Sequence, residues 1–190
     1  MLQSEDHQVT VLSRNEYGDF LAPTYAPSDA VSQLTACDAA LILAGCFELN
    51  AAFARMVQVN ALGPARVANA IHGRFPYAHI ITFLDSRIGR PKTALPPPVC
   101  AYLASKRRLA HWTLAAARCW GRKTGTRVNA IAPGPVLPPP NPDHREKAGP
   151  CLTPRPSVID IHSAVAFLLR TPSVTGQILY VDAGQHLLQD

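Results

Sequence analysis

Short apolar runs alternate with longer amphipathic stretches along the chain. Five runs are rich in aliphatic and β-branched side chains, which is typical of buried strands: residues 9–12, 39–43, 79–84, 127–132 and 177–181. Four stretches have helical spacing: residues 28–35, 51–72, 102–120 and 158–170. Alternation of strands with helices predicts an α/β fold on a mainly parallel sheet with flanking helices.

The chain has 190 residues, which predicts a single domain over residues 1–190. Hydrophobic residues make up 47% of it and charged residues 16%, as expected of a chain that folds. The longest apolar run, residues 39–47, is far shorter than the roughly 18 residues that cross a bilayer. The polar N-terminus does not resemble a secretory signal. We therefore expect a cytoplasmic protein without a membrane partner.

Other features of the composition argue against several kinds of site and partner. Proline clusters at 96–98 and 138–140 predict loops, because proline lacks the N–H group that ladders and helices use. The five cysteines contain no CxxC pair and the histidines no HExxH pair, which argues against a disulfide framework and a metal site. The net charge is +5, but the basic residues between 106 and 123 lack the interleaved aromatic residues of a nucleic-acid module. We expect no nucleic-acid partner.

Candidate chemistry follows the ends of the predicted strands. In an open α/β sheet, ligands lie outside the carboxyl ends of the strands. Residues at or just beyond these ends are Gly45, Asp85, Ser86, Pro133 and Gly134. These positions therefore predict the edge of the sheet that binds a ligand.

Tyr102 and Lys106 lie four residues apart in a predicted helix, so their side chains share one face. A lysine ammonium beside a tyrosine hydroxyl favours the phenolate and lowers the tyrosine pKa toward neutrality. This spacing suggests proton transfer, although YxxxK also arises by chance.

Five motifs occur in an order that resembles the short-chain dehydrogenase/reductase superfamily. They are DAALILAG (38–45), VNALGPARVANAI (59–71), YLASK (102–106), VNAIAPGPV (128–136) and TGQILYVDAG (175–184). The resemblance implies a Rossmann-like fold, a nicotinamide cofactor, and oxidation or reduction at a carbonyl, alcohol or imine.

The resemblance also implies roles for individual residues. Tyr102 would supply a proton, and Lys106 would lower its pKa and hold the nicotinamide ribose. Asn60 would anchor a relay water, and Gly45 with the Pro133–Gly134 loop would line the cofactor. Pro64 adds a physical argument, because it cannot donate to the Asn60 carbonyl four residues earlier. That carbonyl would then be left for water, unless the proline only introduces a kink for packing.

One position suggests a subgroup. Within IITFLDSR (80–87), Asp85 resembles the aspartate of pteridine and dihydromonapterin reductases, where most members have serine. Ser86 is adjacent and keeps the serine assignment open. Either residue would position the substrate, or Asp85 would only bind a loop amide. The proline loop after them resembles a small insertion, since Asp85 precedes Tyr102 by more residues than usual.

The N-terminal part departs from the family pattern. The glycine-rich turn that binds the cofactor pyrophosphate is absent from this sequence, so we expect an incomplete N-terminus and weakened binding of NADPH or NADH. Arg14 follows the run 9–12 and resembles the arginine that pairs with the 2′-phosphate of NADPH; a solvated surface arginine is the alternative. Residues 9–12 would fill the vacant central position of the sheet, unless another chain supplies that edge.

Two functions remain open at this stage. The first is an NADPH-dependent reductase acting on a pteridine or another carbonyl or imine. The second is a truncated, inactive family member that serves as a binding or assembly subunit. In both cases the resemblance implies a homo-oligomer, a dimer or tetramer, in which the helices beginning near Ala51 and Tyr102 pair with their copies. The apolar residues expected at that interface are Leu109, Trp112, Ala115, Ala116 and Trp120.

Overall fold

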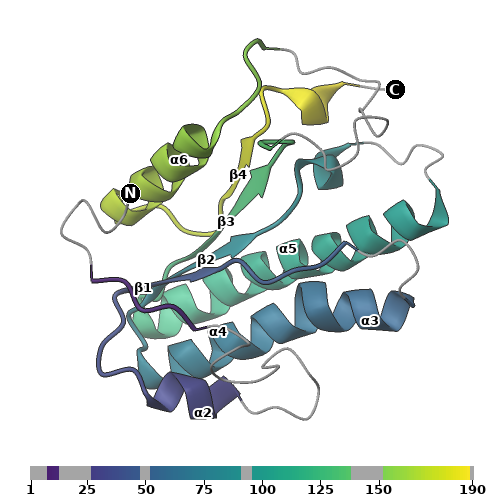
Figure 1. The fold of residues 1–190 in the computed structure, drawn as a ribbon. Helices are drawn as coiled ribbons and strands as arrows, with labels where there is room; N and C mark the ends of the chain where they lie inside the picture. Colours follow the sequence, from purple (N-terminus) through teal and green to yellow (C-terminus); the bar gives the residue numbers. More distant parts are fainter. Residues whose placement is uncertain (1–7, 13–26, 48–51, 91–95, 138–151, 189–190) are drawn as a thin grey trace.

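The computed structural model describes residues 8–12, 27–47, 52–90, 96–137 and 152–188. They form a parallel sheet of four strands in the order β1-β2-β3-β4. The strands are β1 (Ala39–Ile42), β2 (His79–Phe83), β3 (Val128–Pro133) and β4 (Ile178–Val181). The α-helices are α2 (Pro27–Ser32), α3 (Phe53–Val57), α4 (Gly63–Arg74), α5 (Pro97–Thr124) and α6 (Val158–Arg170). Figure 1 shows α4 and α5 on one face of the sheet and α6 on the other, which confirms the Rossmann-like α/β fold.

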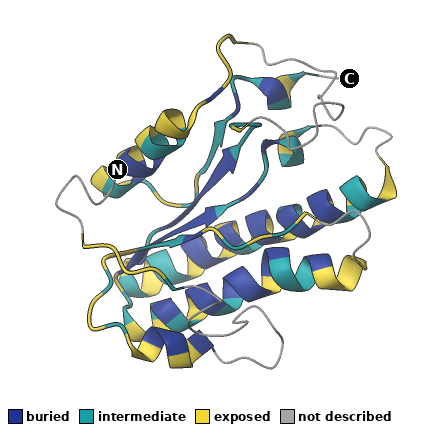
Figure 2. Ribbon diagram, viewed as in Figure 1, coloured by how far each residue is buried: buried dark blue, intermediate teal, exposed yellow. Residues whose placement is uncertain are grey.

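The core consists of two apolar layers, one on each face of the sheet. Successive strand residues point to opposite faces, so Ile80 packs with Ile71 of α4 while Ile81 packs with Leu168 of α6. Figure 2 shows the buried strands between these helices. Because both faces are covered, the central strands are mostly apolar, which is why they could be recognised as apolar runs.

Four of the five predicted strands are confirmed as β1 to β4, and the first is wrong. Residues 8–12 have no regular structure, and Val9 and Val11 are 39% and 67% exposed. A four-residue apolar run becomes a strand only where a neighbouring strand satisfies its backbone groups. Among the described residues β1 pairs only with β2, so residues 9–12 do not fill the position beside it. Arg14, expected just beyond this run, lies outside the described residues.

All four predicted helices are present; α6 has the predicted bounds, and the boundaries of the other three differ. The stretch 51–72 is divided into α3, a π-helical turn (Gln58–Leu62) and α4. The expected loop at 96–98 is wrong for Pro97 and Pro98, which form the first turn of α5. Proline is tolerated there because the first N–H groups of a helix have no partner within it. Within the described part of the chain, no helix is both long and apolar enough to span a membrane.

The parallel topology brings the strand ends to one edge of the sheet. Gly45 follows β1, Asp85 follows β2, Gly134 follows β3 and Asp182 follows β4. Two short 3₁₀ helices lie at this edge, Ser86–Gly89 after β2 and Gln185–Leu187 after β4, and they contact each other. The edge predicted from the sequence is therefore formed by the residues expected there.

Candidate active site

Tyr102 and Lys106 lie in the first half of α5, with their side chains toward the end of β2. Both are buried, and Tyr102 packs with Met56 and Leu103. Lys106 Nζ donates a hydrogen bond of 3.0 Å to the carbonyl oxygen of Phe83, the last residue of β2. The lysine therefore ties the helix to the strand at the edge where ligands are expected.

Asp85, rather than Ser86, lies beside the tyrosine hydroxyl. The Asp85 carboxylate interacts with the Tyr102 hydroxyl, and this interaction raises the pKa of the tyrosine. Ser86 begins the 3₁₀ helix after β2 and is 1% exposed. Of the two residues that the sequence left open, Asp85 is the one that interacts with the Tyr102 side chain.

Arg87 binds the Asp85 carboxylate through both its backbone and its side chain. Its backbone N–H donates to Oδ1 at 2.9 Å, while Nε and Nη2 donate to Oδ1 and Oδ2 at 3.1 and 2.9 Å. Burial acts to raise the pKa of Asp85, but hydrogen bonds and the positive charge from Arg87, with a smaller effect of Tyr102, hold it below its ordinary value. Asp85 is therefore an ionised hydrogen-bond acceptor at neutral pH.

The pKa of Tyr102 is raised, which corrects the expectation that Lys106 lowers it. Burial is the largest cause, and the negative charge of Asp85 adds to it. Arg87, not Lys106, is the cation that opposes the rise. Burial also lowers the pKa of Lys106, against the charges of Asp85 and Cys46. In the protein without ligands, the tyrosine hydroxyl is therefore firmly protonated.

Asn60 is completely buried and fixes the backbone that follows Gly45. Its Oδ1 accepts from the Cys46 N–H at 2.7 Å, and its Nδ2 donates to the Cys46 carbonyl at 2.9 Å and to Ser105 Oγ at 3.1 Å. Ser105 Oγ in turn donates to the Tyr102 carbonyl at 2.6 Å. Asn60 thus links the end of β1 to the turn of α5 that carries the tyrosine.

Gly45 is required by close packing in this cluster. A Cβ atom at Gly45 would lie 3.0 Å from Lys106 Nζ and 3.2 Å from Asn60 Oδ1. The backbone can therefore pass between the lysine and the asparagine only without a side chain. The structure thus brings together Gly45, Asn60, Asp85, Tyr102 and Lys106 as the sequence predicted.

The helix bearing Asn60 widens immediately before Pro64. Gln58–Leu62 is a π-helical turn, in which the Gly63 N–H donates to the Gln58 carbonyl five residues earlier. Pro64 cannot donate, and the change of hydrogen-bond register falls where its missing N–H interrupts the α-helical pattern. The proline therefore has a visible effect on the backbone that positions Asn60.

Pro133 and Gly134 close the site from the third strand. The Gly134 N–H donates to the Val181 carbonyl at 3.0 Å, and a Cβ at Gly134 would lie 2.7 Å from Asp182 Cβ. Asp182 itself accepts from the His186 N–H at 2.7 Å and from the Gly184 N–H at 3.1 Å. The Pro133–Gly134 loop is thus packed against the turn after β4, which the Asp182 carboxylate stabilises.

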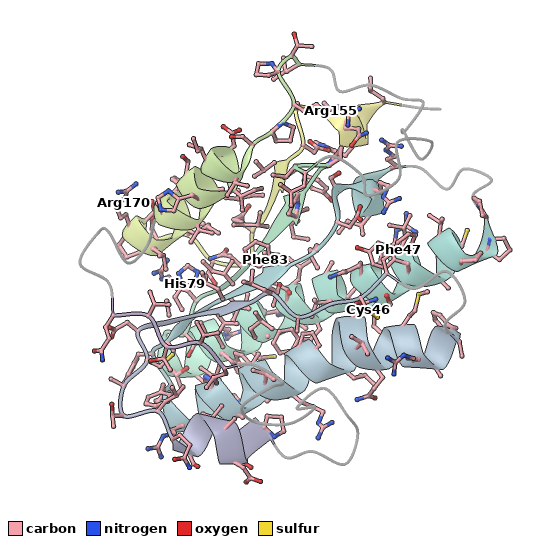
Figure 3. All side chains as sticks on the ribbon, viewed as in Figure 1. Cys46, Phe47, His79, Phe83, Arg155 and Arg170 are labelled. Carbon is pink, nitrogen blue, oxygen red and sulfur yellow. The ribbon has the colours of Figure 1, made fainter. Side chains whose placement is uncertain are left out.

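Sequence reasoning assigned no role to Phe47 and Arg87, which frame Tyr102. The ring of Phe47 contacts the Tyr102 ring edge-on, with centroids 4.8 Å apart. The Arg87 guanidinium lies 5.9 Å from the Phe47 centroid and 5.7 Å from that of Tyr102. Figure 3 shows Cys46 and Phe47 beside α5. The position of Arg87, two residues after Asp85 at a strand end, was the signal available in the sequence.

Comparison with known proteins identifies the family. Residues 46–186 match the family model described as enoyl-(acyl carrier protein) reductase. The chain therefore belongs to this family, within the short-chain dehydrogenase/reductase superfamily. No curated protein matches the chain.

Solved structures share the fold at low sequence identity. A short-chain dehydrogenase from Burkholderia cenocepacia in complex with NADP is 22% identical, with a TM-score of 0.74 over 88% of this chain and 74% of that chain. Acetoin dehydrogenase YohF from Salmonella typhimurium is 24% identical, with a TM-score of 0.68 over 89% and 74%. FolM alternative dihydrofolate reductase 1 from Brucella canis, complexed with NADP, is 23% identical, with a TM-score of 0.69 over 85% and 68%.

Proposed function

We propose that the protein is an NADPH-dependent reductase of carbonyl or imine compounds. The observation that carries this proposal is the juxtaposition of Tyr102, Asp85 and Lys106 at the end of β2, where the tyrosine and the lysine are buried and the tyrosine hydroxyl interacts with the Asp85 carboxylate. A protonated hydroxyl at such an edge is a proton donor for an oxygen or nitrogen that becomes basic during reduction.

The residues present fit the nicotinamide half of the cofactor. The backbone at Gly45 packs directly against Lys106 and Asn60, and the Pro133–Gly134 loop borders the same edge. Bound NADPH would supply a hydride to the substrate. Lys106 and Tyr102 would hold the nicotinamide ribose, while Gly45 and the proline–glycine loop would line the ring. Two of the structural neighbours named above were solved with NADP, which supports the choice of cofactor.

The preference for NADPH over NADH is proposed from Arg14. Its guanidinium would pair with the 2′-phosphate as a planar and permanently charged fork. Since the sequence lacks the glycine-rich turn, we expect binding in the micromolar to millimolar range rather than tighter.

Tyr102 would donate the proton, and Asp85 would orient the substrate. Because the pKa of Asp85 is lowered, this carboxylate accepts hydrogen bonds from a substrate N–H and does not protonate it. A reduced pteridine offers such N–H groups beside a reducible C=N bond. The position of Asp85 resembles that in pteridine reductases, and the likeness to FolM is compatible with this substrate class.

We also propose that the protein forms a homo-oligomer through α4 and α5. Of the residues expected at this interface, Leu109 and Ala116 belong to the chain's own core, which corrects their assignment. Leu62 and Leu114 are instead 43% and 42% exposed on the π turn and on α5. A shallow hollow runs between these helices, lined by Gln58, Leu62, Ala65, Arg66, Asn69 and Trp112. A second copy packed over it would cover the exposed leucines.

The experiment that tests the proposed function combines binding and turnover. Calorimetric titration with NADPH and with NADH measures cofactor binding, and absorbance of NADPH reports its oxidation with dihydrobiopterin. We expect binding of NADPH, weaker binding of NADH, and turnover that depends on the pteridine or on another carbonyl substrate. No heat with either nucleotide at millimolar concentration would overturn the reductase and favour the inactive binding or assembly subunit.

A further inference from the structure

We propose that Arg87 makes the site selective for substrates that carry a carboxylate next to the carbonyl, such as short oxo acids. This inference rests on the proposed function and names a substrate class for the same site. It is based on the position of the guanidinium over Tyr102, on its exposure and on the charges around it.

Arg87 is held in place on three sides. Asp85 accepts hydrogen bonds from its Nε and Nη2, and the rings of Phe47 and Tyr102 lie 5.9 and 5.7 Å from the guanidinium carbon. An arginine fixed in this way loses little conformational entropy when it binds a ligand. It is therefore preorganised for an anion that arrives above the Tyr102 ring.

The guanidinium is also reachable from solvent. The Arg87 side chain is 25% exposed, compared with 16% for Asp85. A substrate carboxylate that enters from solvent can share the guanidinium with Asp85. It can also replace Asp85 there, since the two carboxylates have the same planar shape and the same acceptor oxygens. The short distance between the guanidinium and the Tyr102 ring places that carboxylate close to the group that receives the proton, which favours 2-oxo acids.

The local charge favours an anion as well. The Asp85 carboxylate acts on Tyr102 and on two cations, Arg87 and Lys106. Lys106 is 5% exposed and donates to the neutral Phe83 carbonyl. A substrate carboxylate would be attracted by both cations in a partly buried site, where Coulomb interactions are weakly screened.

The test compares phenylglyoxylate with its methyl ester, which differ mainly in the negative charge. NADPH oxidation would be measured for the wild type, Arg87→Met, Arg87→Lys and Arg122→Met; Arg122 is an exposed arginine in the last turn of α5. We expect Arg87→Met to lower kcat/KM for the acid about 10²-fold and for the ester less than about 5-fold. Arg87→Lys should fall between, and Arg122→Met should match the wild type. Equal losses for acid and ester would overturn the proposal, because Arg87 would then act only through Asp85.

A binding measurement separates this proposal from the proposed reductase activity. Calorimetry or NMR titration with mandelate and methyl mandelate, without nucleotide and with NADPH, requires no turnover. Wild-type protein should bind mandelate at least about 10-fold more tightly than the ester, and Arg87→Met should lose this preference. A preference for mandelate without any NADPH oxidation would support the anion site while contradicting the reductase. Absence of the preference in active wild-type enzyme would overturn the anion site alone.

Discussion

Lys106 donates its hydrogen bond to the carbonyl oxygen of Phe83 at 3.0 Å, so a buried ammonium group is held by a neutral acceptor at the end of β2. The pKa of Tyr102 is raised by burial and by the negative charge of Asp85, and Arg87 is the cation that opposes the rise. Burial lowers the pKa of the lysine itself. The charge is therefore costly for the fold, and we attribute its presence to function.

Lys106→Met tests this attribution. Methionine has a similar length and removes the buried charge together with one hydrogen bond, so we expect the free energy of unfolding to change by less than about 1.5 kcal/mol. NADPH binding and turnover should nevertheless fall by about 10²-fold or more. Denaturant unfolding and calorimetric titration of the same variant measure the two effects. A large loss of stability with cofactor binding intact would mean that Lys106 is structural.

Ala183 has a positive φ of 53°, a conformation that strains a residue with a Cβ atom. It lies in the turn after β4, where the motif of the family has glycine. Ala183→Gly should therefore stabilise the protein by about 0.5–1 kcal/mol, measured by denaturant unfolding. Gly184, with φ of 77°, provides the opposite change: Gly184→Ala should destabilise the protein by about 1–2 kcal/mol. Lower stability of Ala183→Gly would show that the turn tolerates alanine without strain.

His79 makes stability depend on pH. It is 2% exposed at the start of β2, and burial together with the charge of Arg127 lowers its pKa from 6.5 to about 4. The unfolded chain therefore binds a proton between pH 6.5 and 4 that the folded chain does not, so this contribution is complete above pH 6.5 and is lost as the pH falls. We expect a loss of about 3 kcal/mol by pH 4 from this residue.

Unfolding of the wild type and of His79→Gln at pH 7 and pH 4.5 measures this dependence. The difference between the two pH values should be smaller in His79→Gln. His111→Gln, which replaces an exposed histidine on α5, serves as the control and should keep the wild-type dependence. The same dependence in all three proteins would contradict the role of His79.

The proposed oligomer interface can be broken with one charge. Leu62→Glu places a carboxylate in the hollow between α4 and α5, where a second copy would have to remove it from water. Light scattering should report a dimer or tetramer for the wild type and a monomer for Leu62→Glu at micromolar concentration. Val158→Glu, at an exposed apolar position on α6, should leave the state unchanged. A monomeric wild type would contradict the interface.

The sequence predicted the parts of this fold that depend on local pattern. Strands β1 to β4 are mostly apolar runs because helices cover both faces of the sheet, and parallel pairing then fixes which strand ends meet. Residues 9–12 are also a short apolar run, but a strand also needs a neighbouring strand to pair with. The pattern of apolar residues along the chain does not show whether such a neighbour exists. Pro97 and Pro98 were expected in a loop because proline tolerance depends on the position within a helix.

The residues that come together at the candidate site were expected from the sequence, whereas several of their contacts were not. Gly45, Asn60, Asp85, Tyr102 and Lys106 come together as their motifs indicated. The pairing of Asp85 with Arg87 and the contact of Lys106 with Phe83 depend on side-chain directions that only the folded chain defines. Burial of Tyr102 and the negative charge of Asp85 reverse the expected sign of the Tyr102 pKa shift.

The central claim is that Tyr102 donates the proton in an NADPH-dependent reduction, and Tyr102→Phe tests it most directly. Phenylalanine keeps the ring that packs on Met56 and Phe47 and removes only the hydroxyl, so the variant should remain folded. Tyr77→Phe is the matched control, since Tyr77 is 80% exposed and precedes β2 at the opposite edge of the sheet. We predict that NADPH oxidation falls about 10²-fold or more in Tyr102→Phe and is unchanged in Tyr77→Phe. Unchanged oxidation in folded Tyr102→Phe would contradict the account.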